Sequence, residues 1–115
     1  MPSTTGFKFG DVVLVPFPFT DQSAIKRRPA VVISGERYNR DRPDLIIMAV
    51  TSQTRVPSVH GDIELTAWKN AGLLKPSAIK PIIATIEQSL VLRRLGRLTE
   101  VDQRALRRSL EAVIG

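Results

Sequence analysis

Two apolar, strand-like segments joined by a polar loop dominate the first third of the chain. In GDVVLVPFPFTDQSAIKRRPAVVI (residues 10–33), the first segment covers 12–19 and the second 29–33. Both are rich in β-branched residues, which favour strands over helices. Pro16 and Pro18 have no backbone N–H, so this end of the first strand must lie at a sheet edge or leave the sheet.

The loop between these segments ends in a cluster of positive charge. Lys26, Arg27 and Arg28 directly precede Pro29. A proline disfavours helical backbone in the residue before it, so we expect Arg28 to be extended at the mouth of the second strand. A cationic cluster held between two buried strands is well placed to bind a phosphate. A solvated basic loop without a ligand is the alternative.

The remaining β-type segments suggest a small barrel. Residues 45–50 (LIIMAV) form a short apolar run that predicts a buried central strand. Residues 63–65 alternate as a strand does, and residues 78–86 are β-branched and apolar but interrupted by Lys80 and Pro81. Short strands at close spacing with little helix predict a small barrel-like β domain.

The turns and the C-terminal helix are also visible in the sequence. Residues 66–72 (TAWKNAG) suggest one helical turn, in which Trp68 is expected to pack rather than to stack on a base. Residues 93–98 (RRLGRL) suggest a basic turn. Thr99 is expected to cap a helix, with Asp102 as its capping-box partner. The apolar face that should pack this helix on the sheet consists of Leu106, Leu110, Val113 and Ile114.

A series of short motifs links these segments in a fixed order. GDVVLVPFPFTD is followed by KRRPAVVIS, then AVTSQ, LLKPSAI, ATIE and LGRL. In order and spacing, the series resembles the MazF/PemK family of toxin endoribonucleases over residues 9–114. The resemblance implies a small SH3-like β-barrel of the PemK, MazF and CcdB type with a C-terminal helix, usually a homodimer.

Composition limits the chemistry that is available. The 115 residues suit a single domain, in which residues 1–8 are expected to form a loose tail. The sequence contains no cysteine and one histidine, His60, which is expected at an exposed turn. Thiolate chemistry, and an imidazole pair within one chain, are therefore excluded, and we expect neither a metal site nor a cofactor. RNA cleavage would depend on arginine, lysine, threonine or a carboxylate.

The net charge points to an anionic partner. At +6, with an isoelectric point near 10.5, the chain favours nucleic acid or an acidic protein. No apolar run approaches the roughly 20 residues of a membrane helix, and no signal-peptide core precedes the first strand. We therefore expect a cytoplasmic protein.

The resemblance assigns roles to particular residues. It implies that Arg28 and Thr51 form the catalytic pair. A guanidinium can bind two phosphate oxygens at once, and a threonine hydroxyl can donate one more hydrogen bond. Ser52 and Gln53 match the polar residues that follow the threonine. Lys26 and Arg27 are further candidates for phosphate contact.

Two departures from the family pattern affect the expected site. The family often has a glutamate in the loop before the arginine, whereas the nearest carboxylate here is Asp21, our candidate general base. A basic residue often precedes the Thr-Ile pair, but here it is Ala84, so Lys75 or Lys80 is expected to bind RNA instead.

The first functional interpretation is a sequence-specific, metal-independent endoribonuclease that cuts single-stranded messenger RNA through its 2′-hydroxyl. It leaves 2′,3′-cyclic phosphate and 5′-hydroxyl ends, inhibits translation, and acts as the toxin of a pair whose antitoxin is acidic. The alternatives are a non-catalytic toxin of the same fold that poisons DNA gyrase, and a plain nucleic-acid-binding barrel. The RNA cleavage motif and the antitoxin's identity do not follow from the sequence.

Overall fold

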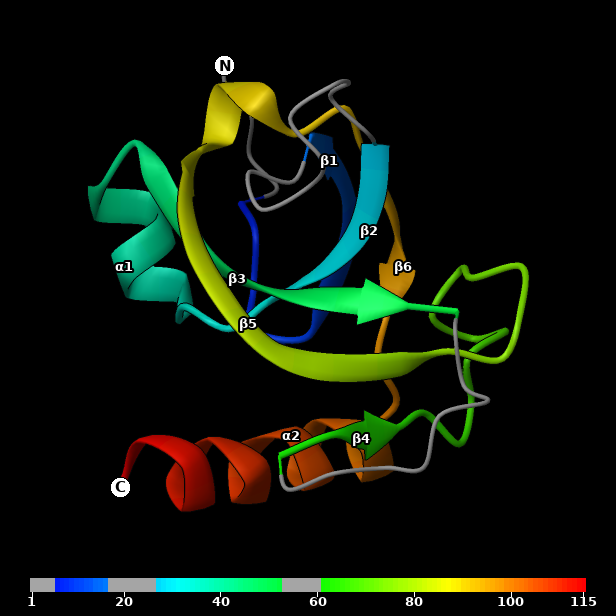
Figure 1. Cartoon of the computed structure of the whole chain (residues 1–115). Helices are drawn as coiled ribbons and strands as arrows, with labels where there is room; N and C mark the ends of the chain where they lie inside the picture. Colours follow the sequence, from blue (N-terminus) through cyan, green and yellow to red (C-terminus); the bar gives the residue numbers. More distant parts are fainter. Residues whose placement is uncertain (1–5, 17–26, 53–60) are drawn as a thin grey trace.

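Six strands form one curled antiparallel sheet, with a helix lying across it (Figure 1). The computed structural model describes residues 6–16, 27–52 and 61–115. The elements are β1 (Asp11–Pro16), β2 (Arg27–Val32), α1 (Glu36–Asp41), β3 (Asp44–Thr51), β4 (Ile63–Glu64), β5 (Ala78–Glu87), the 3₁₀ turn η1 (Gln88–Leu90), β6 (Arg93–Arg97) and α2 (Glu100–Ile114). The strand order is β4-β5-β3-β2-β1-β6. The predicted small β-barrel with a C-terminal helix is confirmed, as a half-barrel.

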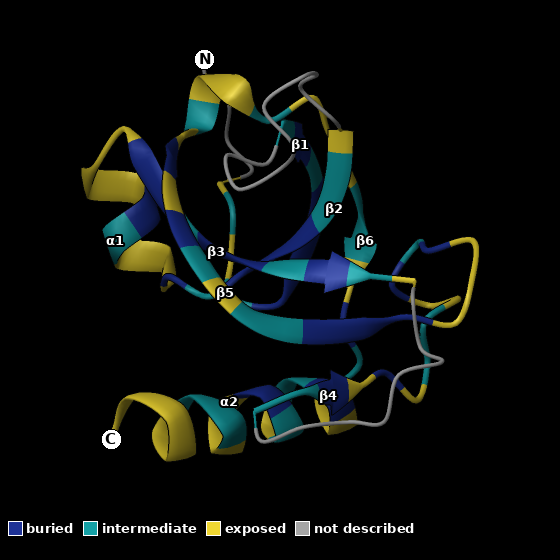
Figure 2. Ribbon diagram, in the orientation of Figure 1, coloured by how far each residue is buried: buried dark blue, intermediate teal, exposed yellow. Residues whose placement is uncertain are grey.

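The central strands are buried on both faces (Figure 2). Successive strand residues point to opposite sides, so each strand contributes to two core clusters. Val12, Val31 and Met48 belong to the cluster that includes Leu106 of α2. The other cluster contains Val13, Val15, Ala30, Val32, Leu45, Ile47, Ala84 and Ile86. Burial of both faces explains why these strands are continuous apolar runs, and it confirms residues 45–50 as a central strand.

Pro16, at the end of the first strand, is accommodated as expected. The pairing of β1 with β6 stops at Leu14, whereas the pairing with β2 continues to Pro16, which faces Arg27. Pro16 therefore has no β6 partner opposite it. Residues 17–19 lie outside the described part of the chain.

Strand β5 passes through its Lys-Pro interruption without ending. Met48 pairs with Ile83 and Val50 with Ile79, so three residues of β5 face one residue of β3. Such a bulge tolerates a proline because the ladder is already broken there. The predicted interruption is thus a local irregularity in one ten-residue strand.

The segment predicted as a basic turn is instead the edge strand β6, which pairs with β1. The prediction was wrong because an edge strand can place charges toward solvent, which hides the apolar alternation of a strand. Two of its arginines bind the carboxylate of Asp11, with Arg97 Nη1 at 2.8 Å and Arg94 Nη2 at 3.1 Å. Asp11 is 2% exposed, so these contacts compensate for burying its charge.

Part of the expected loose tail is attached to the sheet. The backbone N–H of Lys8 donates to Asp11 over 2.9 Å, and Phe7 packs against the second core cluster. The sequence suggested otherwise because the stretch before Phe7 is small and polar. Residues 1–5 are not among the described residues.

Helix α2 begins at its predicted cap, but Asp102 has another role. The Asp102 N–H donates to Thr99 Oγ1 over 3.4 Å. The Asp102 carboxylate points away from the cap. It accepts hydrogen bonds from the Thr66 N–H, the Thr66 hydroxyl and the Ala67 N–H at 2.9–3.1 Å. The predicted capping box is therefore absent from this helix. Residues 66–72 are held against α2 by these hydrogen bonds and contain the predicted helical turn, which is closed by the Ala71 N–H donating to the Ala67 carbonyl over 3.3 Å. Trp68 packs on the first core cluster as predicted.

The apolar face of α2 is buried only in its first half. Leu106 is fully buried and Leu110 packs partly on the core. Val113 and Ile114 were predicted to pack on the sheet but are 39% and 66% exposed. The last turns of the helix are exposed in Figure 2, so the sheet covers only part of the periodic stripe. None of the described helices is both long and apolar enough to cross a membrane.

A hydrogen-bonded carboxylate fixes α1 against β3 and makes stability depend on pH. The Tyr38 hydroxyl donates to Asp44 over 2.5 Å, and Arg42 Nε lies 3.0 Å from the same carboxylate. The Tyr38 hydrogen bond, followed by that from Arg42, lowers the pKa of Asp44 below its usual 3.8. A carboxylate whose pKa is lower in the folded state stabilises the fold at pH values above its unfolded-state pKa. This contribution disappears as the pH falls through the folded-state pKa.

We therefore expect Tyr38→Phe to melt below the wild type at pH 7, with the gap narrowing below about pH 4 as the carboxylate is protonated. Thermal melting of both proteins from pH 7 to pH 3 measures this. A gap that stays constant over the whole range would contradict the assignment.

Candidate functional site

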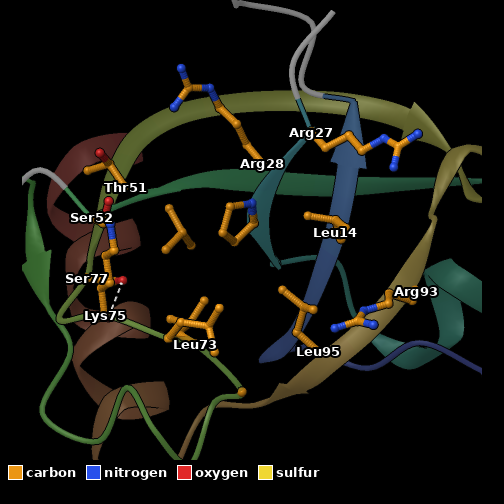
Figure 3. A pocket seen from close by; sticks show the side chains of 14 residues that line it. Leu14, Arg27, Arg28, Thr51, Ser52, Leu73, Lys75, Ser77, Arg93 and Leu95 are labelled. Carbon is orange, nitrogen blue, oxygen red and sulfur yellow. Dashed lines mark hydrogen bonds between the residues drawn. The ribbon is translucent and has the colours of Figure 1, made fainter.

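A pocket of about 440 Å³ opens at the end of the sheet where β1 and β3 end and β2 begins (Figure 3). The segment 72–77 and strand β6 complete its walls. The lining residues are Leu14, Arg27, Arg28, Pro29, Val50, Thr51, Ser52, Gly72, Leu73, Leu74, Lys75, Ser77, Arg93 and Leu95.

The antiparallel pairing of β2 with β3 explains why both residues of the predicted pair border this pocket. Ala30 on β2 pairs with Ala49 on β3 in an antiparallel ladder. Arg28 lies two residues before Ala30 and Thr51 two residues after Ala49, so both lie just beyond the last paired residues at the same end of the two antiparallel strands. The two residues are far apart in sequence, and both line the pocket. Arg28 is extended within β2, as the following proline predicted.

Most of the other predicted contacts that are described lie around the same pocket. Arg27, Ser52 and Lys75 line it together with the pair. In Figure 3, Thr51 and Ser52 lie on one side of the pocket, near Ser77 and Lys75, and Arg28 extends along the upper rim. The rim therefore offers guanidinium, ammonium and hydroxyl donors, the groups that bind phosphate oxygens.

The centre of the pocket is apolar. Leu14, Pro29, Val50, Leu73 and Leu95 supply this surface, and Leu74 is 93% exposed on the adjoining loop. A cationic rim around an apolar floor suits a ligand with an anionic backbone and flat rings, because the rim attracts the backbone and the floor packs against the rings.

Some predicted residues are elsewhere. Lys80 does not line the pocket, because its Nζ lies 2.6 Å from Asp62 Oδ2 at the side of β5 that faces β4. Lys26, Gln53, Asp21 and His60 fall outside the described residues. Within residues 6–16, 27–52 and 61–115, no cluster of three histidine or acidic residues is placed to hold a metal ion.

The sequence did not identify the far wall of the pocket. Leu95 on β6 and Ser77 before β5 line it although no site role was predicted for them, and Arg93 lines it although it was predicted only as part of a basic turn that attracts an acidic antitoxin. The signal for Arg93 lies in the pairing of β6 with β1, where Arg93 faces Leu14. That signal is lost when the segment is interpreted as a turn.

Sequence comparison identifies the family. Residues 8–114 match the PemK-like, MazF-like toxins of type II toxin–antitoxin systems. The chain belongs to this family. A comparison with curated protein sequences finds no match.

Solved structures show that this PemK/MazF-like chain shares its fold with such toxins. One is an endoribonuclease in complex with its cognate antitoxin from a mycobacterial species, with TM-score 0.76, 15% identity, and 94% of each chain covered. Another is the Mycobacterium tuberculosis toxin MazF-mt6, with TM-score 0.73 and 17% identity over 90% of this chain and 95% of that one. A third is MazE-MazF from Deinococcus radiodurans, with TM-score 0.72 and 19% identity over 96% and 97%.

Proposed function

We propose that this PemK/MazF-like toxin is an endoribonuclease that cuts single-stranded messenger RNA in the cytoplasm and so inhibits translation. The observation that carries the proposal is that Arg28 and Thr51 line the same pocket, together with Arg27 and Lys75. The structural relatives named as endoribonucleases support the same class of reaction.

In the proposed reaction, the ribose 2′-oxygen attacks the adjacent phosphorus and the bond to the 5′-oxygen breaks. The products are a 2′,3′-cyclic phosphate and a 5′-hydroxyl. The Arg28 guanidinium binds two non-bridging oxygens, and the Thr51 hydroxyl donates to the charge that grows on them. Lys75, Arg27 and Ser52 hold the flanking backbone.

The proton transfers require a base for the 2′-hydroxyl and an acid for the leaving oxygen. The described lining residues include no aspartate or glutamate. Asp21 remains our candidate base.

We further propose that an acidic antitoxin inhibits the toxin and that the toxin acts as a homodimer. A pocket rimmed by arginine and lysine attracts carboxylates as well as phosphates, because guanidinium groups bind both. The net charge of +6 supports this partner.

The mechanism predicts that cleavage needs the 2′-hydroxyl and no metal ion. With purified toxin and a long messenger RNA, we expect unchanged cleavage in excess EDTA and fragments that end in 2′,3′-cyclic phosphate. Once a cut site is mapped, one deoxyribose at that position should block cleavage there and leave other sites cut. Efficient cutting at the deoxyribose, or loss of activity in EDTA, would refute the mechanism. Growth arrest without RNA cleavage would favour a gyrase poison.

A further inference from the structure

The three arginines of β6 are divided between the two sides of the strand. Arg94 and Arg97 bind the buried carboxylate of Asp11, and Arg94 also donates to the Gly6 carbonyl over 3.2 Å. Arg93 pairs with Leu14 in the ladder and lines the pocket with it. Two of these cations therefore have a structural role, and the third faces the proposed site.

Arg93 has no anionic partner among the described residues. It forms no ion pair there, whereas Arg94 and Arg97 share one carboxylate. The pocket gathers Arg27, Arg28 and Lys75 near it, again without a described acidic group. Several like charges around one pocket repel one another, and a bound polyanion removes that repulsion.

Arg93 lies across the pocket from the proposed catalytic pair. In Figure 3 its guanidinium lies beside Leu95, opposite Thr51 and Ser52. In the sheet order, β6 is two strands from β2 and three from β3. Arg93 therefore faces a different part of a bound strand than Arg28 and Thr51 do, with Leu14 and Leu95 between them.

We propose that Arg93 binds a backbone phosphate of the RNA next to the scissile one, so that the intervening nucleotide lies over the apolar floor of the pocket. This inference rests on the proposed function. It makes Arg93 a substrate-binding residue, whereas Arg94 and Arg97 stabilise the fold through Asp11.

The test compares Arg93→Gln with Arg93→Lys and with the control Arg104→Gln. The Arg104 side chain lies on the exposed side of α2, 4.0 Å from Glu100. The binding probe is a 20-nucleotide, mixed-sequence RNA with 2′-O-methyl groups throughout, which blocks 2′-hydroxyl attack. We expect Arg93→Gln to bind it about tenfold more weakly, the size of one charge-assisted contact. The slope of log K against log salt should become shallower by about 0.7.

Cleavage of a long messenger RNA should show the same loss in KM, with kcat nearly unchanged. Arg93→Lys should keep the wild-type salt slope, and Arg104→Gln should match the wild type throughout. Wild-type affinity and slope in a folded Arg93→Gln variant would overturn the role of Arg93. If the wild type cuts no RNA, the proposed function fails, and the salt slope alone then decides whether Arg93 binds phosphate.

Discussion

Arg28→Ala and Thr51→Ala are each expected to lower RNA cleavage by about 10²–10³-fold, the usual loss when one donor to a developing negative charge is removed. Both residues lie at the rim of the pocket rather than in the core clusters, so their melting temperatures should stay close to that of the wild type. Cleavage of a long messenger RNA and thermal melting measure the two effects.

Two further variants sharpen this prediction. Thr51→Ser keeps a hydroxyl and should retain most of the activity that Thr51→Ala loses. The Arg37 side chain on α1 is 89% exposed, so the Arg37→Ala variant should cleave RNA as the wild type does. A fully active Arg28→Ala variant would disprove the proposed catalytic pair.

Gly72→Ala and Gly96→Ala should be the most destabilising small substitutions in the described sheet region. A Cβ at Gly72 would lie 1.9 Å from the Leu95 carbonyl oxygen, and a Cβ at Gly96 would lie 2.5 Å from the Ala71 carbonyl group. Both clashes are with backbone, which cannot rotate away. Gly72 also has φ of +82°, which costs a residue with a side chain about 1–2 kcal/mol.

Overpacking typically costs about 1–3 kcal/mol, so we expect at least that loss in the free energy of unfolding for Gly96→Ala and a larger one for Gly72→Ala. Urea unfolding measures both. Gly6→Ala is the matched control, because nothing lies within 4 Å of its added carbon. Equal stability of all three variants would show that the segment 66–77 does not lie so close to β6.

The sequence predicted the interior of the sheet better than its edges. Runs such as residues 45–50 are apolar because both faces of β3 are buried, so composition alone identifies them. Strand β6 lies at the edge of the sheet. Its arginines either bind Asp11 or line the pocket, so its sequence resembles that of a turn. The role of Asp102 was also hidden, since a carboxylate three residues after Thr99 fits a capping box equally well.

The site was predictable where it depends on strand ends. Arg28 before a proline and Thr51 after an apolar run both mark the point where a strand meets a loop, and adjacent antiparallel strands bring such points together. The sequence did not predict the position of Lys80, because its ion-pair partner Asp62 directly precedes β4, whereas Lys80 lies on β5. Arg93 could not be placed either, because it reaches the pocket only through the pairing of β6 with β1.

The closure of β6 on β1 also has a consequence for the order in which the pocket can form during synthesis. β1 is the first strand to leave the ribosome and β6 the last, yet they are neighbours in the sheet. Until residues 93–97 emerge, the pocket lacks the wall that carries Arg93 and Leu95, and Asp11 lacks both of its arginines. A nascent chain therefore cannot offer the complete pocket to RNA before β6 has paired with β1.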